Sequence, residues 1–144
     1  MTLECASYLS QVVLTGITAV AAYVAYHQVQ TFKKFELLKI LEDPRVRKAR
    51  RLLYQKLRAS AKHRKNWWQH DDKLEEAAST VCASFDIVGL MAKGCNRHFF
   101  RNEWAYNICW TYEVLGEYIK DRNPGGYRGY HQLYKEARPY RRLS

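Results

Sequence analysis

The N-terminal part of the chain is an almost unbroken run of apolar residues. From Cys5 to Phe32 it contains no Asp, Glu, Lys or Arg, and two lysines then end the run. About 20 apolar residues, rising about 1.5 Å each in a helix, are enough to cross the hydrocarbon core of a bilayer. The pattern therefore predicts a transmembrane anchor over residues 1–32, with the span itself at about residues 7–28.

Two other structures fit a run of this kind. A cleavable signal peptide has a basic start and a shorter apolar stretch, whereas here the leading residues carry Glu4 and no Lys or Arg. A soluble core helix would tolerate Gln11, Thr15 and Thr18, but it would have to bury an unusually long charge-free segment. The charge pattern favours the transmembrane helix.

Small and polar side chains recur within the span at alternating steps of four and three residues. They are Gln11, Thr15, Thr18, Ala22 and Ala25, and they share one face of a helix. In lipid, such faces allow two helices to approach closely and to form interhelical hydrogen bonds. The pattern predicts self-association as a homodimer, and the simpler alternative is that small residues are merely frequent here.

The rest of the chain has helical periodicity and no sustained strand alternation. Apolar residues at helical spacing continue past the lysines, which predicts that the first helix extends beyond the span. These residues are Phe32, Phe35, Leu38 and Leu41. Asp43 and Pro44 then have the residue types preferred at the N-cap and first position of a new helix. The apolar stripe of that helix consists of Val46, Ala49, Leu52, Leu53 and Leu57.

Three further helices are expected. Asp72 and Glu75 have capping-box spacing, and the apolar residues over 74–92 follow the helical period. Another helix is expected over about residues 102–121, and a short last one over about residues 127–138. The sequence thus predicts an all-α protein, with one N-terminal transmembrane helix followed by a small cytoplasmic helical bundle of about four helices.

The positive charge is concentrated directly after the anchor. The chain has a formal net charge of +10, and residues 33–70 contain thirteen basic and three acidic residues. We therefore expect basic juxtamembrane helices and a linker over 33–70, and the bundle core with a basic C-terminal tail over 71–144. Because positive residues flank membrane spans on the cytoplasmic side, we expect a single-pass protein of the cell inner membrane, with its N-terminus outside and its C-terminal domain in the cytoplasm.

Anionic lipid is the expected partner of the basic region, and nucleic acid is the less favoured alternative. Basic residues near a membrane surface attract anionic lipid by about 1 kcal/mol each, whereas tryptophans beside basic residues also suit stacking on bases. The residues expected to make either contact are Lys33, Lys34, Arg45, Arg47, Lys48, Arg51, Arg58, Lys62, Arg64, Lys65, Trp67 and Trp68.

The sequence does not indicate a metal, cofactor or catalytic site. Cys95 and His98 form one Cys-x-x-His pair, with Cys82 and Cys109 as further candidate ligands, but zinc sites usually combine two closely spaced pairs. The widely spaced cysteines are expected to be reduced. Glycine-rich phosphate loops and a serine elbow are absent from the sequence, so an enzyme remains an unsupported alternative.

Asp86 stands out as the only charged residue in the apolar stretch 77–92. A carboxylate among apolar residues is rarely buried without a partner. We expect a buried ion pair between Asp86 and Arg122, with Arg97 and Arg101 as alternative partners. An acid that lines a pocket is the other interpretation.

Several segments together resemble a family of small bacterial membrane-anchored proteins. After an N-terminal span, these segments are LLKILEDPRVRKARRLLY, EEAASTVCASFDIVGLMAKG, NEWAYNICWTYEVLGEYI, Arg122 and GYRGYHQLYKEARPY. The resemblance extends over nearly the whole chain, and the family is known only as a domain of unknown function. It implies bacterial origin and a helical cytoplasmic domain, and it implies no activity and no functional residues.

Three functions remain open from the sequence. The first is a membrane-tethered interaction or regulatory domain that holds an unknown protein partner, with its bundle surface and its tail over residues 138–142. The second is a module that binds anionic lipid or nucleic acid through residues 33–70. The third is an enzyme with an unrecognised site, which requires Asp86 and Arg122 to line one cleft.

Overall fold

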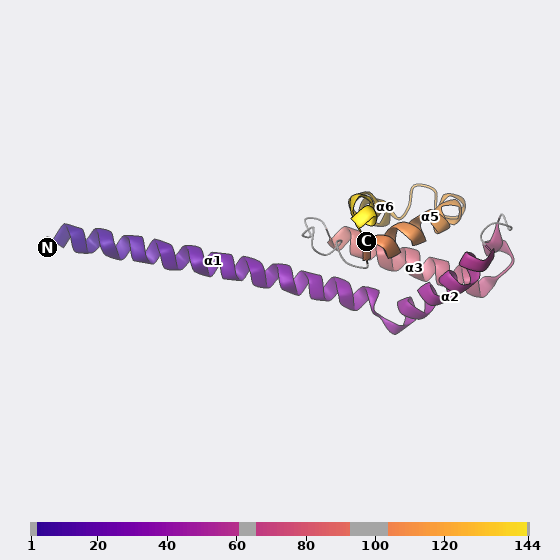
Figure 1. Ribbon diagram of the computed structural model, residues 1–144, viewed down its shortest axis with the longest axis horizontal. Helices are drawn as coiled ribbons and strands as arrows, with labels where there is room; N and C mark the ends of the chain where they lie inside the picture. The colour runs from indigo at the N-terminus through magenta and orange to yellow at the C-terminus, as the bar shows by residue number, and fades with distance from the viewer. Residues whose placement is uncertain (1–2, 61–65, 93–103, 144) are drawn as a thin grey trace. The chain divides into compact units, whose positions relative to one another are not determined.

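The computed structural model describes the backbone of residues 3–60, 66–92 and 104–143. Within these ranges the chain is all-α and has no strand. The α-helices are α1 (Leu3–Leu41), α2 (Pro44–Ser60), α3 (Asp72–Met91), α5 (Trp104–Arg122) and α6 (Arg128–Ala137), and the short 3₁₀ helices are η1 (Trp67–Gln69) and η2 (Arg138–Leu143) (Figure 1). The predicted fold class, one long apolar N-terminal helix followed by a helical domain, is confirmed.

The chain divides into two compact units, Met1–Lys33 and Lys34–Ser144. The first unit consists of the apolar part of α1, and every side chain described over residues 6–29 is exposed. The helix is long and apolar enough to cross a membrane, with a mean hydropathy of 1.5 in its most apolar window. In water such a surface would be strongly unfavourable, because exposed apolar area raises the free energy by about 25 cal/mol per Å².

The second unit is a helical bundle built around α3. In Figure 1, α3 runs between α2, drawn below it, and α5 and α6, drawn above it, and it packs against both α2 and α6. The largest fully buried side chains come from every helix of this unit: Leu37, Leu41, Leu53, Val81, Phe85, Val88, Ile108, Leu115, Tyr130 and Leu133. The core thus includes residues of α2 together with residues of the helices over 71–144.

The end of α1 joins this core through a stripe that was predicted only in part, because Leu41 is buried and Leu38 packs against the core as expected, whereas Leu37 was not predicted. Leu37 and Leu41 are buried, whereas Phe32 and Phe35 are 65% and 75% exposed. Phe35 follows the same helical period as Leu38, but it lies on the side of this last part of α1 that faces away from the bundle core. The expectation that the helix continues past the lysines is confirmed.

The helix starts follow local capping chemistry. The Arg45 N–H donates to Asp43 Oδ1 at 2.8 Å, so Asp43 caps α2 as predicted, with Pro44 as its first residue. At α3 the cap lies one residue earlier than predicted, because Asp71 Oδ1 accepts from the Leu74 N–H at 3.1 Å. The predicted stop after α3 and the predicted start near residue 102 lie outside the described residues.

Helices α3 and α6 make a close backbone contact at two glycines, Gly89 and Gly129. A Cβ atom at Gly89 would lie 1.8 Å from the carbonyl oxygen of Gly129, so only glycine fits at this position. The contact brings Tyr130 fully into the core, where its hydroxyl donates to Thr111 Oγ1 at 2.7 Å. After α6 the chain continues as η2 rather than ending its helical course at Pro139.

Candidate functional site

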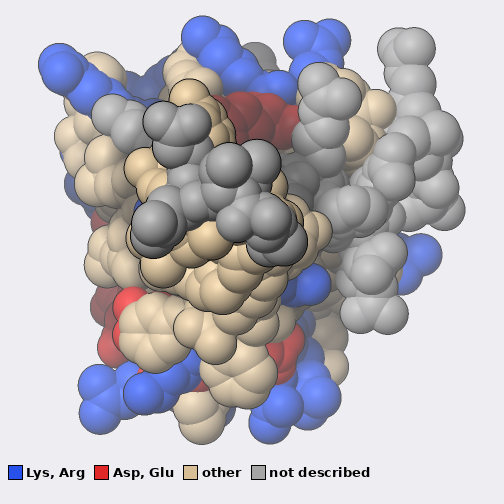
Figure 2. All heavy atoms as spheres, turned by 90° about the vertical axis from the view of Figure 1, so that its left-hand side faces the viewer, with Lys and Arg blue, Asp and Glu red and all other residues tan. Residues whose placement is uncertain are grey.

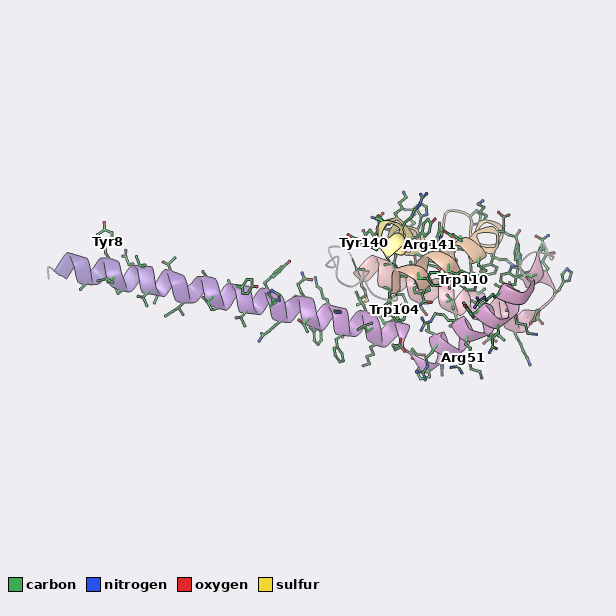
Figure 3. The ribbon with its side chains drawn as sticks, in the orientation of Figure 1. Tyr8, Arg51, Trp104, Trp110, Tyr140 and Arg141 are labelled. Carbon is green, nitrogen blue, oxygen red and sulfur yellow. The ribbon has the colours of Figure 1, made fainter. Side chains whose placement is uncertain are left out.

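Helix α2 has two chemically distinct faces. Its apolar side chains Val46, Ala49, Leu53 and Leu57 are buried, and α2 packs along α3. An α-helix repeats every 3.6 residues, so when this stripe is buried, the residues on the other side of α2 point toward solvent. The basic side chains that are exposed as a result are Arg45, Arg47, Lys48, Arg51, Lys56 and Arg58. In Figure 3, Arg51 projects from α2 on the side away from α3 and α5.

Three of these arginines form a row. Arg47, Arg51 and Arg58 are separated by four and seven residues, so their directions around α2 differ by only about 40°. We call these three residues the α2 arginine row. In Figure 2, Lys and Arg side chains also project from several edges of the face shown.

Acidic residues do not neutralise α2. The helix contains seven basic residues and no Asp or Glu. Among the residues that the structure describes, the ion pairs are Lys120 with Glu117, Arg122 with Glu75 and Arg141 with Glu113, all of them outside α2. Within the described ranges, the α2 arginine row is therefore a cationic surface without an ion-pair partner. The predicted contacts Lys33 and Lys34 are also exposed, whereas Lys62, Arg64 and Lys65 lie outside the described residues.

Arg50 has a structural environment that the sequence did not reveal. Its Nη2 donates to the Leu41 carbonyl oxygen at 2.9 Å, and its guanidinium carbon lies 4.7 Å from the centre of the Trp104 ring. Burial lowers the pKa of Arg50 from its ordinary value, although the side chain stays charged at neutral pH. Arg50 thus links the end of α1 to α5, while the other basic residues of α2 face solvent.

The two neighbouring tryptophans are packing residues. Trp68 is only 4% exposed, and its indole Nε1 donates to Asp121 Oδ2 at 2.8 Å. Trp67 stacks on Tyr118 with 5.9 Å between ring centres. Trp68 is thus part of the core, and in this structure its ring is not exposed for the predicted contact with lipid or nucleic acid.

Asp86 does not pair with Arg122. Its Oδ1 accepts from the Tyr130 N–H at 3.1 Å, in the first turn of α6. The residue before α6, Tyr127, has a left-handed backbone (φ 51°) and forms no side-chain cap of its own. Asp86 therefore caps α6 from α3, and Arg122 pairs instead with Glu75 at 2.9 Å. The alternative partners Arg97 and Arg101 lie outside the described residues.

The two cysteines of α3 and α5 offer no accessible nucleophile. Cys82 and Cys109 are free and buried. Burial, with a smaller effect of nearby Asp86, raises the pKa of Cys82 to about 12, so its thiol stays protonated and unreactive at neutral pH. Three or more metal-ligating side chains do not cluster among the described residues, and Cys95 and His98 lie outside them.

The C-terminal tail is packed against the bundle. Helix η2 contacts both α5 and α6, and Arg141 forms an ion pair with Glu113 of α5. Figure 3 shows Tyr140 and Arg141 on this segment. The tail is therefore part of the folded unit over its described residues and is not an extended basic arm.

The predicted self-association face of the anchor stays a prediction. The hydroxyls of Thr15 and Thr18 donate to the carbonyl oxygens of Gln11 and Leu14 in the same helix, each at 2.8 Å. A shallow groove on α1 has a different lining: Val13, Gly16, Ile17, Val20, Ala21, Val24, Ala25 and Gln28. It shares only Ala25 with the predicted face.

Comparison of the chain with protein-family models, curated proteins and solved structures finds no match.

Proposed function

We propose that the chain is a single-span protein of the inner membrane of a bacterial cell, with its N-terminus outside and its helical bundle in the cytoplasm. In this proposal the α2 arginine row rests against anionic lipid of the inner leaflet and holds the bundle at the membrane. The observation that carries the proposal is a cationic helix face that forms no ion pair with any residue the structure describes, and that follows an apolar exposed helix in the chain.

The short connection between the two elements supports this placement. From Lys33 to Leu41 the helix advances by eight residues and so rises only about 12 Å, at about 1.5 Å per residue. The screening length at physiological salt is about 8 Å, so charges just beyond the headgroups still interact with the membrane. The exposed Phe32 and Phe35 then suit the headgroup boundary, and Tyr8, near the start of α1 in Figure 3, suits the opposite boundary.

The strength of the interaction follows from the number of charges. Each basic residue near an anionic surface contributes about 1 kcal/mol, so the three arginines contribute about 3 kcal/mol, or roughly a hundredfold in the docking equilibrium. Polar substitution of all three should therefore release α2 from the membrane while leaving the buried face of the helix unchanged.

The test uses the full chain in nanodiscs, with a spin label at Gln55→Cys on the exposed side of α2. In nanodiscs that contain phosphatidylglycerol, we expect the label to be protected from a water-soluble relaxation agent, and we expect the R47Q/R51Q/R58Q variant to lose that protection. The matched control, K73Q/K135Q/R138Q, removes the same charge from exposed positions elsewhere. Equal protection in purely zwitterionic nanodiscs would contradict the proposal, and so would equal loss in both triple variants.

Nucleic acid is distinguished in the same preparation. A mobility shift with single-stranded oligonucleotide, at matched salt and in zwitterionic nanodiscs, should be weak and nonspecific if lipid is the partner. Tighter binding to oligonucleotide than to phosphatidylglycerol would favour the nucleic-acid alternative, whose affinity should fall steeply with salt.

A protein-interaction or regulatory role is the second candidate, and it has a separate observation behind it. On α3, Ile87, Leu90 and Met91 are 49%, 54% and 41% exposed, at a spacing that places them on one side of the helix. Large exposed apolar residues of this kind suit a partner helix. A photo-crosslinker at Ile87 should then capture one protein in native membranes, and a crosslinker at exposed Lys73 should not.

A further inference from the structure

A cleft of about 410 Å³ lies on the bundle where α5 turns into α6. Its size is within the range of small-molecule sites, which is roughly 300–1,000 Å³. Three features build it: the last turns of α5, the turn between the helices, and the first turns of α6. The residues that line it are Tyr112, Ile119, Lys120, Pro124, Gly125, Gly126, Arg128 and His131.

One wall of the cleft is aromatic and rigid. The Tyr112 ring stacks on the Tyr134 ring with 4.3 Å between centres, and it meets the buried Tyr130 ring edge-on at 5.0 Å. Ile119 and Pro124 add apolar surface to the lining. A ring or short aliphatic group of a ligand would therefore meet a preformed apolar surface that does not have to be ordered on binding.

The imidazole in the cleft is held by a hydrogen bond. Tyr112 Oη lies 2.6 Å from His131 Nδ1. Burial, with a smaller effect of nearby Tyr134, raises the pKa of Tyr112, so its hydroxyl stays protonated and can donate to Nδ1. In that arrangement the imidazole proton is on Nε2, the ring nitrogen left to donate to a ligand.

Two cations line the cleft, and its described lining residues include no Asp or Glu. Lys120 comes from the last turn of α5, and Arg128 is the first residue of α6. Acidic groups near these elements already have partners: Asp121 accepts from the Trp68 indole, and Glu113 pairs with Arg141. Asp86 is bound to the Tyr130 N–H, and Glu117 pairs with Lys120 at 3.5 Å in a solvent-facing contact. A solvent-facing pair of this kind contributes little and exchanges readily for a better anion.

The turn keeps one side of the cleft open. Gly125 has φ 78°, a left-handed conformation that favours glycine, and a Cβ built there would meet no atom within 4 Å. The backbone at this point therefore borders empty space and not a side chain. A bulky anion can approach it without displacing protein atoms.

We propose that this cleft binds a small phosphomonoester, whose phosphate is held by Lys120, Arg128 and His131 and whose organic part lies against Tyr112 and Ile119. Planar guanidinium and ammonium groups are the usual partners of phosphate oxygens in proteins. The ester comes either from a soluble metabolite or from a phosphatidate headgroup of the membrane to which we propose the chain is anchored. The phosphate chemistry is the same in both cases.

The probe is phenyl phosphate, titrated calorimetrically into the full chain in zwitterionic nanodiscs, with inorganic phosphate as the reference. We expect saturable binding of phenyl phosphate that is tighter than that of inorganic phosphate, and at least tenfold weaker binding in K120Q/R128Q. The control K73Q/K135Q removes two exposed charges outside the cleft and should bind like the unaltered chain. A chain that binds no phenyl phosphate would overturn the proposal, as would equal weakening in both double variants.

A second arm identifies the source of the phosphate. If phosphatidate in the nanodisc competes with phenyl phosphate in the unaltered chain but not in K120Q/R128Q, the lipid headgroup is the ligand. If phenyl phosphate binds equally well in nanodiscs with and without phosphatidate, the ligand is a soluble ester. Both outcomes support the cleft. The R47Q/R51Q/R58Q variant, which tests membrane docking, should bind phenyl phosphate normally, so failure of one proposal is distinguishable from failure of the other.

Discussion

The crossing of α3 and α6 gives the sharpest stability prediction. A Cβ atom at Gly89 would lie 1.8 Å from the Gly129 carbonyl oxygen, whereas carbon and oxygen atoms in contact are usually about 3.3 Å apart or more. The neighbouring atoms belong to the backbone of Gly129, so Gly89→Ala can be accommodated only if α6 moves away from α3. Such a shift of about 1.5 Å would loosen the packing of Phe85 and Tyr130, whose rings stack 5.0 Å apart.

The magnitude follows from two opposing effects. Overpacking of a well-packed core usually lowers the free energy of unfolding by about 1–3 kcal/mol, and separation of two backbones lies at the upper end of that range. The higher helix propensity of alanine returns about 1 kcal/mol. We therefore expect Gly89→Ala to destabilise the bundle by about 2 kcal/mol, or roughly 8 °C in Tm.

Gly116→Ala is the matched control. Gly116 lies in α5, and a Cβ there would meet nothing within 4 Å. Only the gain in helix propensity remains, so this variant should be more stable than the parent by about 0.5–1 kcal/mol. The assay is thermal unfolding of the full chain in zwitterionic micelles, followed by tryptophan fluorescence. If Gly89→Ala melts at or above the temperature of Gly116→Ala, the close crossing does not exist.

Three further substitutions test separate parts of the bundle. Asp86→Ala should lower the stability by about 1 kcal/mol because the Tyr130 N–H loses its cap, with Asp86→Asn in between, and an unchanged Tm for Asp86→Ala would rule out the cap. Trp68→Phe should lower the free energy of unfolding by about 1 kcal/mol because the hydrogen bond to Asp121 is lost, as measured by denaturant unfolding followed by circular dichroism. If Trp68→Phe costs the same free energy in a chain that already carries Asp121→Ala, the hydrogen bond is not the cause. The stability should fall as the pH rises above 9, because Cys82 loses its proton near a pKa of 9.0 in the unfolded chain but only near a pKa of about 12 in the native chain. Cys82→Ala should make this fall less steep. A variant with the same pH profile as the parent would contradict the buried thiol.

Periodicity was enough to predict the helices, because each must bury an apolar stripe. The stripe of α2 is the clearest case: Val46, Ala49, Leu53 and Leu57 are buried as predicted. At the end of α1 the same reasoning chose Phe35 and missed Leu37. Two overlapping stripes were compatible with the helical period there, and only the position of the bundle decides which one is covered.

The candidate site was only partly predictable. Charge density indicated the basic region, but Arg50 is indistinguishable in sequence from its neighbours, and its contact with Leu41 depends on how α2 turns back from α1. Asp86 is conspicuous in the sequence as a lone charge, but its partner is the backbone N–H of Tyr130. Every residue except proline has such an N–H, so the sequence cannot indicate which one is the partner. The cleft between α5 and α6 brings together Tyr112 and His131, nineteen residues apart, through tertiary contact that no local pattern encodes.

The central claim is that α1 crosses a membrane with the bundle inside, and its most direct test is sidedness. In intact cells that express the full chain with Cys95 replaced by serine, a membrane-impermeant thiol reagent should label Cys5, while Ser79→Cys, exposed on α3, should react only after permeabilisation. Labelling of residue 79 from outside, or release of the chain from membranes by alkaline carbonate, would contradict the account.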